Sequence, residues 1–266
     1  MAGTQNSRRG VVRDPSEVTG GAHASGRYLK AVDQAQLVSG LIYYTVFLFS
    51  TTVHEAAHAW AAKIGGDLTA YHGGQVSLDP RPHIQREPFG MVILPLISTL
   101  TTGWPFGYAS APYDPRWAMR HPKRAAWMAL AGPGSNLALV VLSVLVIRLG
   151  LLAGGFFAPD SARFGLVVGA VDGGLWRGAA GLTSVMFSMN LVLACLNILP
   201  LPPLDGSAAV VLFMSESSAL RYQQFLWTNP MLGAIGMLVA WRAFDVVFDP
   251  IFWTVVNLVY PGAGYS

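Results

Sequence analysis

The sequence predicts an all-α polytopic membrane protein with five or six transmembrane helices, and three observations support this prediction. Of the 266 residues, 53% are hydrophobic and only 12% are charged, against roughly 25% charged in an ordinary globular protein. The charges are also clustered. Four intervals carry none at all: 89–113, 125–147, 178–204 and 222–241. Such intervals suit helices that cross a bilayer core, which need about 20 residues each. This composition argues against a disordered chain, a soluble domain and a nucleic-acid-binding protein.

The N-terminal region is polar, and the first membrane helix follows it. Residues 1–36 are rich in Gly, Ser, Arg and Asp and are expected to form a flexible tail before a single membrane domain over residues 37–266. The first span is expected over Leu37–Ile64, and Glu55 is the single charge in residues 34–62. The pair Gly65-Gly66 is a typical helix end.

The segment after the first span has a mixed pattern. Polar and apolar residues alternate within residues 67–79, which predicts one or two short β-strands. Residues 89–110 are apolar but are interrupted by Pro95, Gly103 and Pro105. They are expected to form either a kinked span or a re-entrant hairpin, which is tolerated where protein surrounds it.

The rest of the chain alternates apolar spans and short connections. Spans are expected over Ala125–Leu149 and Ala179–Leu199, and prolines end the second of these. Residues 206–221 are expected to form a short helix along the membrane surface. The C-terminal region is expected to form one or two further spans, 225–241 and 244–260, with Arg242 and Asp245 at a turn between them.

The pentad His54-Glu55-Ala56-Ala57-His58 is the most informative motif. Positions i and i+4 of a helix share a face, so both imidazoles can bind one metal ion. The adjacent Glu55 can then act as a general base on a metal-bound water. Titratable groups within an apolar span cost several kcal/mol in lipid (about 3 for a charged one), so they indicate function. Hydrogen bonding inside the helix bundle is the structural alternative.

A catalytic zinc site normally has three protein ligands and one open position. Two ligands would be His54 and His58, and the strongest candidate for the third is Asp205, which follows a proline-rich turn. A helix-capping role for Asp205 stays open. His72 and His83 are competing ligands, but both lie in a polar segment where solvated side chains are expected.

Three motifs together make the sequence resemble the site-2 proteases, the intramembrane zinc metalloproteases of peptidase family M50. The first is the pentad His54–His58 within an apolar span. The second is Asn197–Gly206, which matches the family pattern N-x-x-P-x-P-P-x-D-G. The third is Ala131–Asn136, similar to the family element A-G-P-x-x-N. In addition, Glu87–Gly90 resembles the D-P-x-G stretch of small bacterial members, with Glu in place of Asp.

The resemblance implies roles for six residues. His54, His58 and Asp205 are implied to bind Zn²⁺, and Glu55 is implied to be the general base. The family pattern also implies that two asparagines bind substrate or stabilise the oxyanion, namely Asn136 and Asn197. The predicted strands in residues 67–79 are expected to pair with an extended substrate.

The function implied is zinc-dependent hydrolysis of peptide bonds in transmembrane protein or peptide substrates. The expected location is the bacterial cell (inner) membrane, with the lipid bilayer as surroundings and no nucleic acid as partner. The chain resembles small members without PDZ or CBS domains, so substrate selection is expected to rely on the membrane core or on a separate regulatory partner. The alternatives are a catalytically silent zinc-binding membrane protein that acts as scaffold or regulator, and a small transporter, which predicts internal symmetry that the sequence lacks.

The membrane orientation stays open. If residues 89–110 cross fully, the distribution of Lys and Arg favours a cytoplasmic N-terminus. The resemblance implies an active site near the cytoplasmic face, which places the N-terminus outside because the pentad lies in the C-terminal half of its span.

Overall fold

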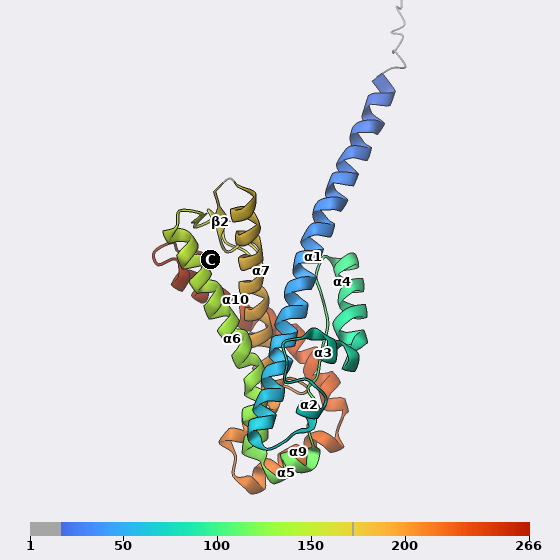
Figure 1. Cartoon of the computed structure of the whole chain (residues 1–266), viewed down its shortest axis with the longest axis vertical. Coiled ribbons are helices and arrows are strands. Elements are labelled where there is room, and N and C mark those ends of the chain that lie inside the picture. Colours follow the sequence, from blue (N-terminus) through green and yellow to red (C-terminus); the bar gives the residue numbers. More distant parts are fainter. Residues whose placement is uncertain (1–16, 172) are drawn as a thin grey trace, which may run out of the picture. The chain divides into compact units, whose positions relative to one another are not determined.

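The computed structural model describes the backbone of residues 17–171 and 173–266, and side chains from residue 37 onward. The chain divides into two units, residues 1–39 and residues 40–266. Helix α1 (Glu17–Gly65) begins in the first unit and ends in the second (Figure 1). The first 16 residues of the expected flexible tail lie outside the described residues, so the division into a tail and one membrane domain stays a prediction.

Beyond α1, the described residues are mostly helical, and the two strands are only two residues long each. In chain order the elements are α2 (Thr69–His72), α3 (Pro80–Arg86), the π-helical turn η1 (Phe89–Ile93), α4 (Leu94–Thr102), α5 (Pro115–Arg120), α6 (Pro122–Leu152), β1 (Phe156–Phe157), β2 (Gly169–Ala170), α7 (Gly174–Asn197), α8 (Asp205–Ala209), the 3₁₀ turn η2 (Val210–Phe213), α9 (Glu216–Thr228) and α10 (Met231–Val259).

Among the described residues, four helices are long and apolar enough to cross a membrane: Leu37–Gly65, Pro122–Leu152, Gly174–Asn197 and Met231–Val259. The all-α polytopic fold class is therefore confirmed. The number of spans is lower than the five or six expected, because the segment after α3 adds none and the C-terminal region adds one instead of two.

The C-terminal region forms the single helix α10 instead of two spans. The helix runs through Arg242 and Asp245, so the turn expected there is absent. No glycine or proline lies between these two residues, so the backbone hydrogen bonds of the helix continue past them. The proline at position 250 lies inside the same helix without ending it.

Residues 89–110 form a hairpin and not a complete span. Together η1 and α4 cover 14 residues, which at about 1.5 Å per residue is too short to cross a bilayer core of about 30 Å. The helix ends at Gly103, whose φ of +76° suits glycine and reverses the chain. The chain then returns in extended conformation.

Hydrogen bonds hold the returning chain against the helix. The Ser98 hydroxyl accepts from the Phe106 amide at 2.7 Å, and further along the Ser110 hydroxyl donates to Glu87 at 2.6 Å. The two ends of the hairpin therefore lie together. Of the two expected alternatives, the structure has the re-entrant hairpin, in which buried protein partners satisfy the irregular backbone.

The strands predicted within residues 67–79 are wrong. The described residues of this segment form the short helix α2 followed by turns. The buried Asp67 accepts hydrogen bonds from the Thr69 amide at 2.9 Å and from the Asp114 amide at 2.8 Å. The first of these bonds is local and favours a turn over a strand. The antiparallel pair β1–β2 lies elsewhere, between α6 and α7.

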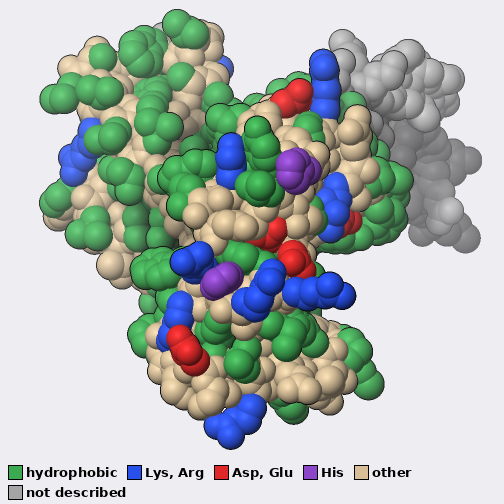
Figure 2. Space-filling view, turned by 60° about the horizontal axis from the view of Figure 1, so that its bottom comes forward, with side chains coloured by type: hydrophobic (Ala, Val, Ile, Leu, Met, Phe, Trp, Pro, Cys, Tyr) green, Lys and Arg blue, Asp and Glu red, His purple; other side chains and the backbone are tan. Residues whose placement is uncertain are grey.

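The core of residues 40–266 lies between α6, α7 and α10. The largest cluster of buried apolar side chains joins these three helices and includes Ile147, Phe187 and Phe252. Charged side chains gather instead at the end that carries α2, α3, α5 and α9 (Figure 2). This polar end suits contact with the aqueous phase or with lipid headgroups.

Candidate metal centre

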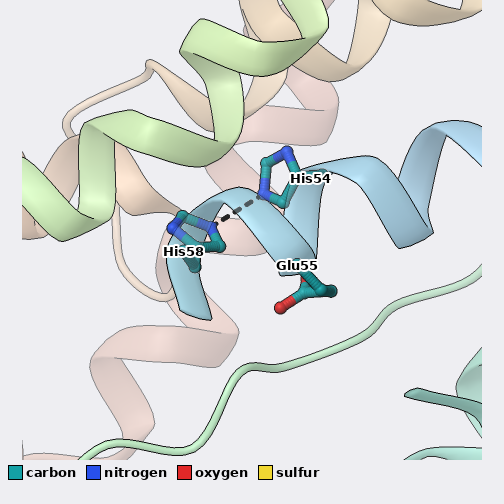
Figure 3. A group of neighbouring side chains, drawn as sticks. All are labelled: His54, Glu55 and His58. Carbon is teal, nitrogen blue, oxygen red and sulfur yellow. Dashed lines mark hydrogen bonds between the residues drawn. The ribbon is translucent and has the colours of Figure 1, made fainter. Parts of the chain in front are cut away.

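Helix α1 brings together the three titratable side chains of the pentad. His54 and His58 lie one turn apart, and their Nε2 atoms are 3.0 Å from each other (Figure 3). Glu55 lies between them in the chain. All three side chains are buried, and together they form the group among the described residues whose ligand atoms lie close enough to hold a metal ion.

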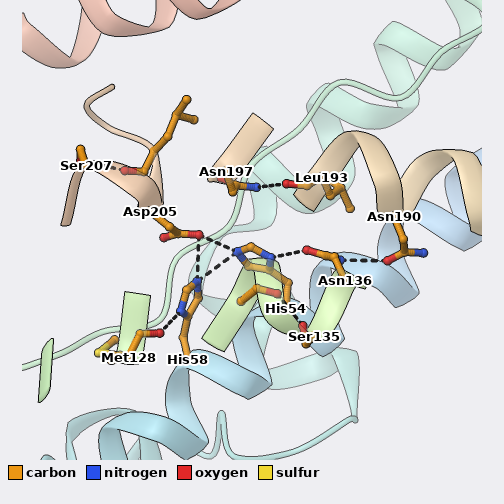
Figure 4. Close-up of polar contacts among 12 residues, drawn as sticks. His54, His58, Met128, Ser135, Asn136, Asn190, Leu193, Asn197, Asp205 and Ser207 are labelled. Carbon is orange, nitrogen blue, oxygen red and sulfur yellow. Dashed lines mark hydrogen bonds and ion pairs between the residues drawn. The ribbon is translucent and has the colours of Figure 1, made fainter. Parts of the chain in front are cut away.

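The turn after α7 adds a fourth side chain to this group. Oδ2 of Asp205 lies 3.1 Å from Nε2 of His54 and 3.3 Å from Nε2 of His58 (Figure 4). The next residue must be small: a Cβ on Gly206 would lie 2.2 Å from the Ile198 carbonyl oxygen. Glycine at this position therefore allows α8 to begin directly against the end of α7.

The three ligand atoms form a triangle with the dimensions of a zinc site. Its edges are 3.0, 3.1 and 3.3 Å. Tetrahedral zinc with ligands at about 2.0 Å has ligand–ligand separations of roughly 3.3 Å. Two imidazoles and one carboxylate are also a donor set typical of catalytic zinc, so these residues fit the ion.

Helix α6 packs closely against both imidazoles. A Cβ on Gly132 would lie 2.3 Å from Nε2 of His58 and 2.5 Å from Nε2 of His54. Pro133 follows inside the same helix and has no N–H to donate to the preceding turn. The glycine thus provides the space for both imidazole rings, which explains why this residue type stands in the middle of a long helix.

Each imidazole uses its second nitrogen for a hydrogen bond. Nδ1 of His58 donates to the Met128 carbonyl at 2.7 Å, and Nδ1 of His54 donates to Oδ1 of Asn136 at 2.6 Å. A neutral imidazole with a proton on Nδ1 has a lone pair on Nε2. In a neutral ring each Nε2 then keeps the lone pair that a metal needs, as such outer hydrogen bonds commonly ensure.

The Asp205 carboxylate is stabilised in its ionised form. Burial alone would raise the pKa of Asp205, but the imidazoles of His58 and His54, when their Nε2 atoms are protonated, lower it well below its usual range by charge and by hydrogen bonding. The segment that follows is anchored by Lys123, whose Nζ donates to the carbonyls of Val211 at 2.8 Å and Leu212 at 2.7 Å.

The carboxylate of Glu55 has a free acceptor. Its Oε2 is buried and has no hydrogen-bond partner within the described part of the chain. Glu55 lines the same cavity as His54 and His58, and this cavity has a volume of about 860 Å³. The extended chain that follows α4 passes beside Glu55 and lines the cavity with residues 107–111 (Figure 3).

The other residues singled out in the sequence lie in three different environments. Asn197 lines the cavity, and its Nδ2 donates to the Leu193 carbonyl at 3.0 Å. Asn136 is fully buried beside His54 and does not line the cavity. His72 is exposed at the end of α2, as expected. His83, in contrast, is buried and not solvated, and its Nε2 lies 3.0 Å from the Ser77 carbonyl oxygen. Neither of these histidines joins the cluster that could hold a metal.

Sequence reasoning missed several residues around this centre. Asn190 and Ser50 are fully buried and extend the hydrogen bonds of Asn136. Their signal in the sequence is a polar side chain within an otherwise apolar span. The backbone acceptor at Met128 and the anchor at Lys123 left no such signal, because a carbonyl is common to all residues and a lysine at a membrane border is ordinary.

Comparisons with known proteins agree with this geometry. The family model described as Peptidase family M50 matches residues 42–239. Rip2 of Mycobacterium tuberculosis (strain Erdman) is 30% identical over 228 residues, which are 79% of this chain and 78% of Rip2. YwhC of Bacillus subtilis (strain 168) is 32% identical over 160 residues, which are 60% of this chain and 63% of YwhC. The names of both relatives describe zinc metalloproteases.

No solved structure matches the chain. The family match covers most of the chain, the relatives are bacterial, and four apolar helices indicate an integral protein of the cell membrane. Together with the His54–Glu55–His58 cluster, these findings identify the chain as a membrane zinc metalloprotease that belongs to peptidase family M50.

Proposed function

We propose that this protein is an intramembrane protease that hydrolyses peptide bonds of transmembrane substrates. The observation that carries the proposal is the position of the metal centre. Two of the three ligand atoms and Glu55 come from one helix, α1, whose residues Leu37–Gly65 are long and apolar enough to span a membrane. A hydrolytic site on such a helix acts where the substrate is itself embedded in lipid.

His54, His58 and Asp205 would hold the zinc ion. Three protein ligands leave one tetrahedral position open, as in catalytic and not in structural zinc sites. The bound ion would supply a Lewis acid that activates a water molecule and polarises the scissile carbonyl.

Glu55 would move the proton. Glu55 lines the cavity, and its Oε2 has no hydrogen-bond partner within the described part of the chain, so the carboxylate is free to accept a proton from the attacking water. The same carboxyl group can then deliver the proton to the leaving amine nitrogen as the peptide bond breaks. A structural metal site needs no such base, and this favours catalysis over the silent scaffold.

The cavity suits an unfolded stretch of substrate. A transmembrane helix must lose its internal hydrogen bonds before a backbone carbonyl can reach the metal centre, and the freed groups then need polar partners. The amide of Asn197 lies on the cavity wall and is the side chain that we assign to this contact. The lipid bilayer is the medium of the reaction, and substrate choice would rest on the membrane core or on a separate regulatory partner.

The test uses the full chain in liposomes with a synthetic single-span peptide. We expect Glu55→Gln to abolish cleavage while the bound zinc per chain stays at the wild-type level. We expect each of the variants His54→Ala, His58→Ala and Asp205→Ala to lose both cleavage and bound zinc. Glu216→Gln, a substitution of an exposed glutamate on α9, is the control and should behave as wild type. Bound zinc without cleavage by the wild-type chain would favour the scaffold instead, and cleavage by Glu55→Gln would contradict the proposed base.

A further inference from the structure

Three buried side chains form a continuous line from α7 through α6 to α1. Nδ2 of Asn190 donates to the Met186 carbonyl at 2.8 Å, and Oδ1 of Asn190 accepts from Nδ2 of Asn136 at 2.9 Å (Figure 4). Oδ1 of Asn136 in turn accepts from Nδ1 of His54 at 2.6 Å. We propose that Asn190 is a positioning residue that, through Asn136, fixes the tautomer in which His54 can bind zinc. The inference rests on the proposed function for the purpose of the zinc site. The experiments that test it measure zinc binding and the tautomer of His54, and do not depend on that function.

The direction of this line follows from its first member. The Met186 carbonyl can only accept a hydrogen bond, so the Asn190 atom that faces it must be the amide nitrogen. The Asn190 atom that faces Asn136 is then the oxygen, which can only accept. This requires Asn136 to present its nitrogen to Asn190 and its oxygen to His54.

The last step concerns the imidazole. Because Oδ1 of Asn136 can only accept, Nδ1 of His54 must carry the proton, and the lone pair of the neutral ring is left on Nε2. Nε2 is the atom that faces His58 and Asp205. One backbone carbonyl in α7 thus determines, through two amide groups, which nitrogen of His54 is available for the metal.

Burial makes the orientation of both amides strict. Asn136 and Asn190 are 0% exposed, as is Ser50, whose hydroxyl accepts from Nδ2 of Asn190 at 2.9 Å. With no exposed surface on these groups, solvent does not compensate for a reversed amide. A reversed Asn190 would place its oxygen against the Met186 carbonyl, and a reversed Asn136 would place its oxygen against Oδ1 of Asn190.

The second imidazole, that of His58, does not depend on a series of side-chain hydrogen bonds. Nδ1 of His58 donates directly to the Met128 carbonyl, and a backbone carbonyl is an acceptor in every variant. The two metal-binding histidines therefore differ: the tautomer of His58 depends on the backbone alone, whereas that of His54 depends on two side chains. Substitution of Asn190 should change the state of His54 and leave that of His58 unchanged.

The test measures zinc affinity by competition with a chelator and the protonation of each imidazole nitrogen by ¹⁵N NMR, both on the full chain. We expect Asn190→Leu to weaken zinc binding about 10- to 100-fold, the range typical of outer-sphere partners of metal ligands. The zinc-free variant should show a mixture of Nδ1–H and Nε2–H forms at His54 and only Nδ1–H at His58. Ser188→Ala is the matched control, because Ser188 is equally buried on α7 but bonds to the Gly165 amide.

A second substitution separates positioning from packing. In Asn136→Asp the carboxylate only accepts, so it holds Nδ1–H of His54 without help from Asn190. Adding Asn190→Leu to Asn136→Asp should therefore cost no further zinc affinity, and it should relieve the contact between two acceptor oxygens. If Asn190→Leu lowers zinc affinity by the same factor in the wild-type and in the Asn136→Asp background, the effect is one of packing and the inference is overturned.

The isosteric variant Asn190→Asp keeps the inference testable if Asn190→Leu does not fold. It retains an acceptor for Nδ2 of Asn136, so His54 should keep its Nδ1–H form. A mixed tautomer in this variant, or an unchanged tautomer in folded Asn190→Leu, would overturn the inference. None of these readouts needs proteolysis, so failure of the inference and failure of the proposed function are distinguishable.

Discussion

Nε2 of His54 lies 3.1 Å from Oδ2 of Asp205, although 151 residues separate them in the chain. The histidine belongs to α1 and the aspartate begins α8. A metal ion bound by both would therefore cross-link the first span of the membrane domain to the connection after α7. Metal binding of this kind stabilises the folded chain, because the unfolded chain has no preformed site.

Removal of zinc should lower the thermal unfolding temperature. Free zinc at about 1,000 times its dissociation constant stabilises the folded state by about 4 kcal/mol. Unfolding in detergent, followed by tryptophan fluorescence with zinc and with chelator, measures the difference. Glu55→Gln should keep the shift and Asp205→Ala should lose most of it. A full shift in Asp205→Ala would exclude this residue as a ligand.

Gly132→Ala should disrupt the metal centre by steric overlap alone. The added Cβ would lie 2.3 Å from Nε2 of His58, so the ring must move away from its ligand position. We expect zinc affinity to fall at least about tenfold, measured by chelator competition. Gly134→Ala is the matched control, since a Cβ there meets nothing within 4 Å. Equal zinc affinity in the two variants would contradict the packing of α6 on the imidazoles.

Lys123→Met should destabilise the segment that carries Asp205. The variant keeps the aliphatic stem but leaves the Val211 and Leu212 carbonyls without their charged donor. Such a loss costs roughly 1–3 kcal/mol of unfolding free energy, which chemical denaturation in detergent measures. Arg120→Met removes only an exposed pair with Asp114 at 3.8 Å and should cost about 0–1 kcal/mol. A Lys123→Met effect no larger than this would exclude the anchor.

The hairpin of residues 89–110 predicts that its two flanks lie on one side of the membrane. The test uses two single-cysteine variants, Gln85→Cys and Arg116→Cys, each made in a Cys195→Ser background. Both should react with a membrane-impermeant thiol reagent from the same side of sealed vesicles. Both native residues are exposed. Labelling from opposite sides would show that this segment crosses the bilayer.

Much of the fold was predictable because charge is expensive in lipid. The gaps between charged residues located α1, α6, α7 and part of α10, and Gly65-Gly66 marked the end of α1, where Gly66 adopts a φ of +98°. Charge alone did not distinguish a short hairpin from a span, because both are apolar. The charge pattern also did not show that residues 67–79 would form turns. One hydrogen bond that holds Asp67 in place comes from the amide of Asp114, which is distant in the sequence.

The sequence likewise determined only part of the candidate metal centre. Local spacing determined that His54, Glu55 and His58 would share one region of α1, because i and i+4 residues of a helix are neighbours. Only the tertiary structure brought Asp205 to 3.1 Å from His54, placed Gly132 against the imidazoles and aligned Asn190, Asn136 and His54. Those contacts join different helices, and the packing of α6 and α7 against α1 decides them; no spacing within the chain encodes that packing.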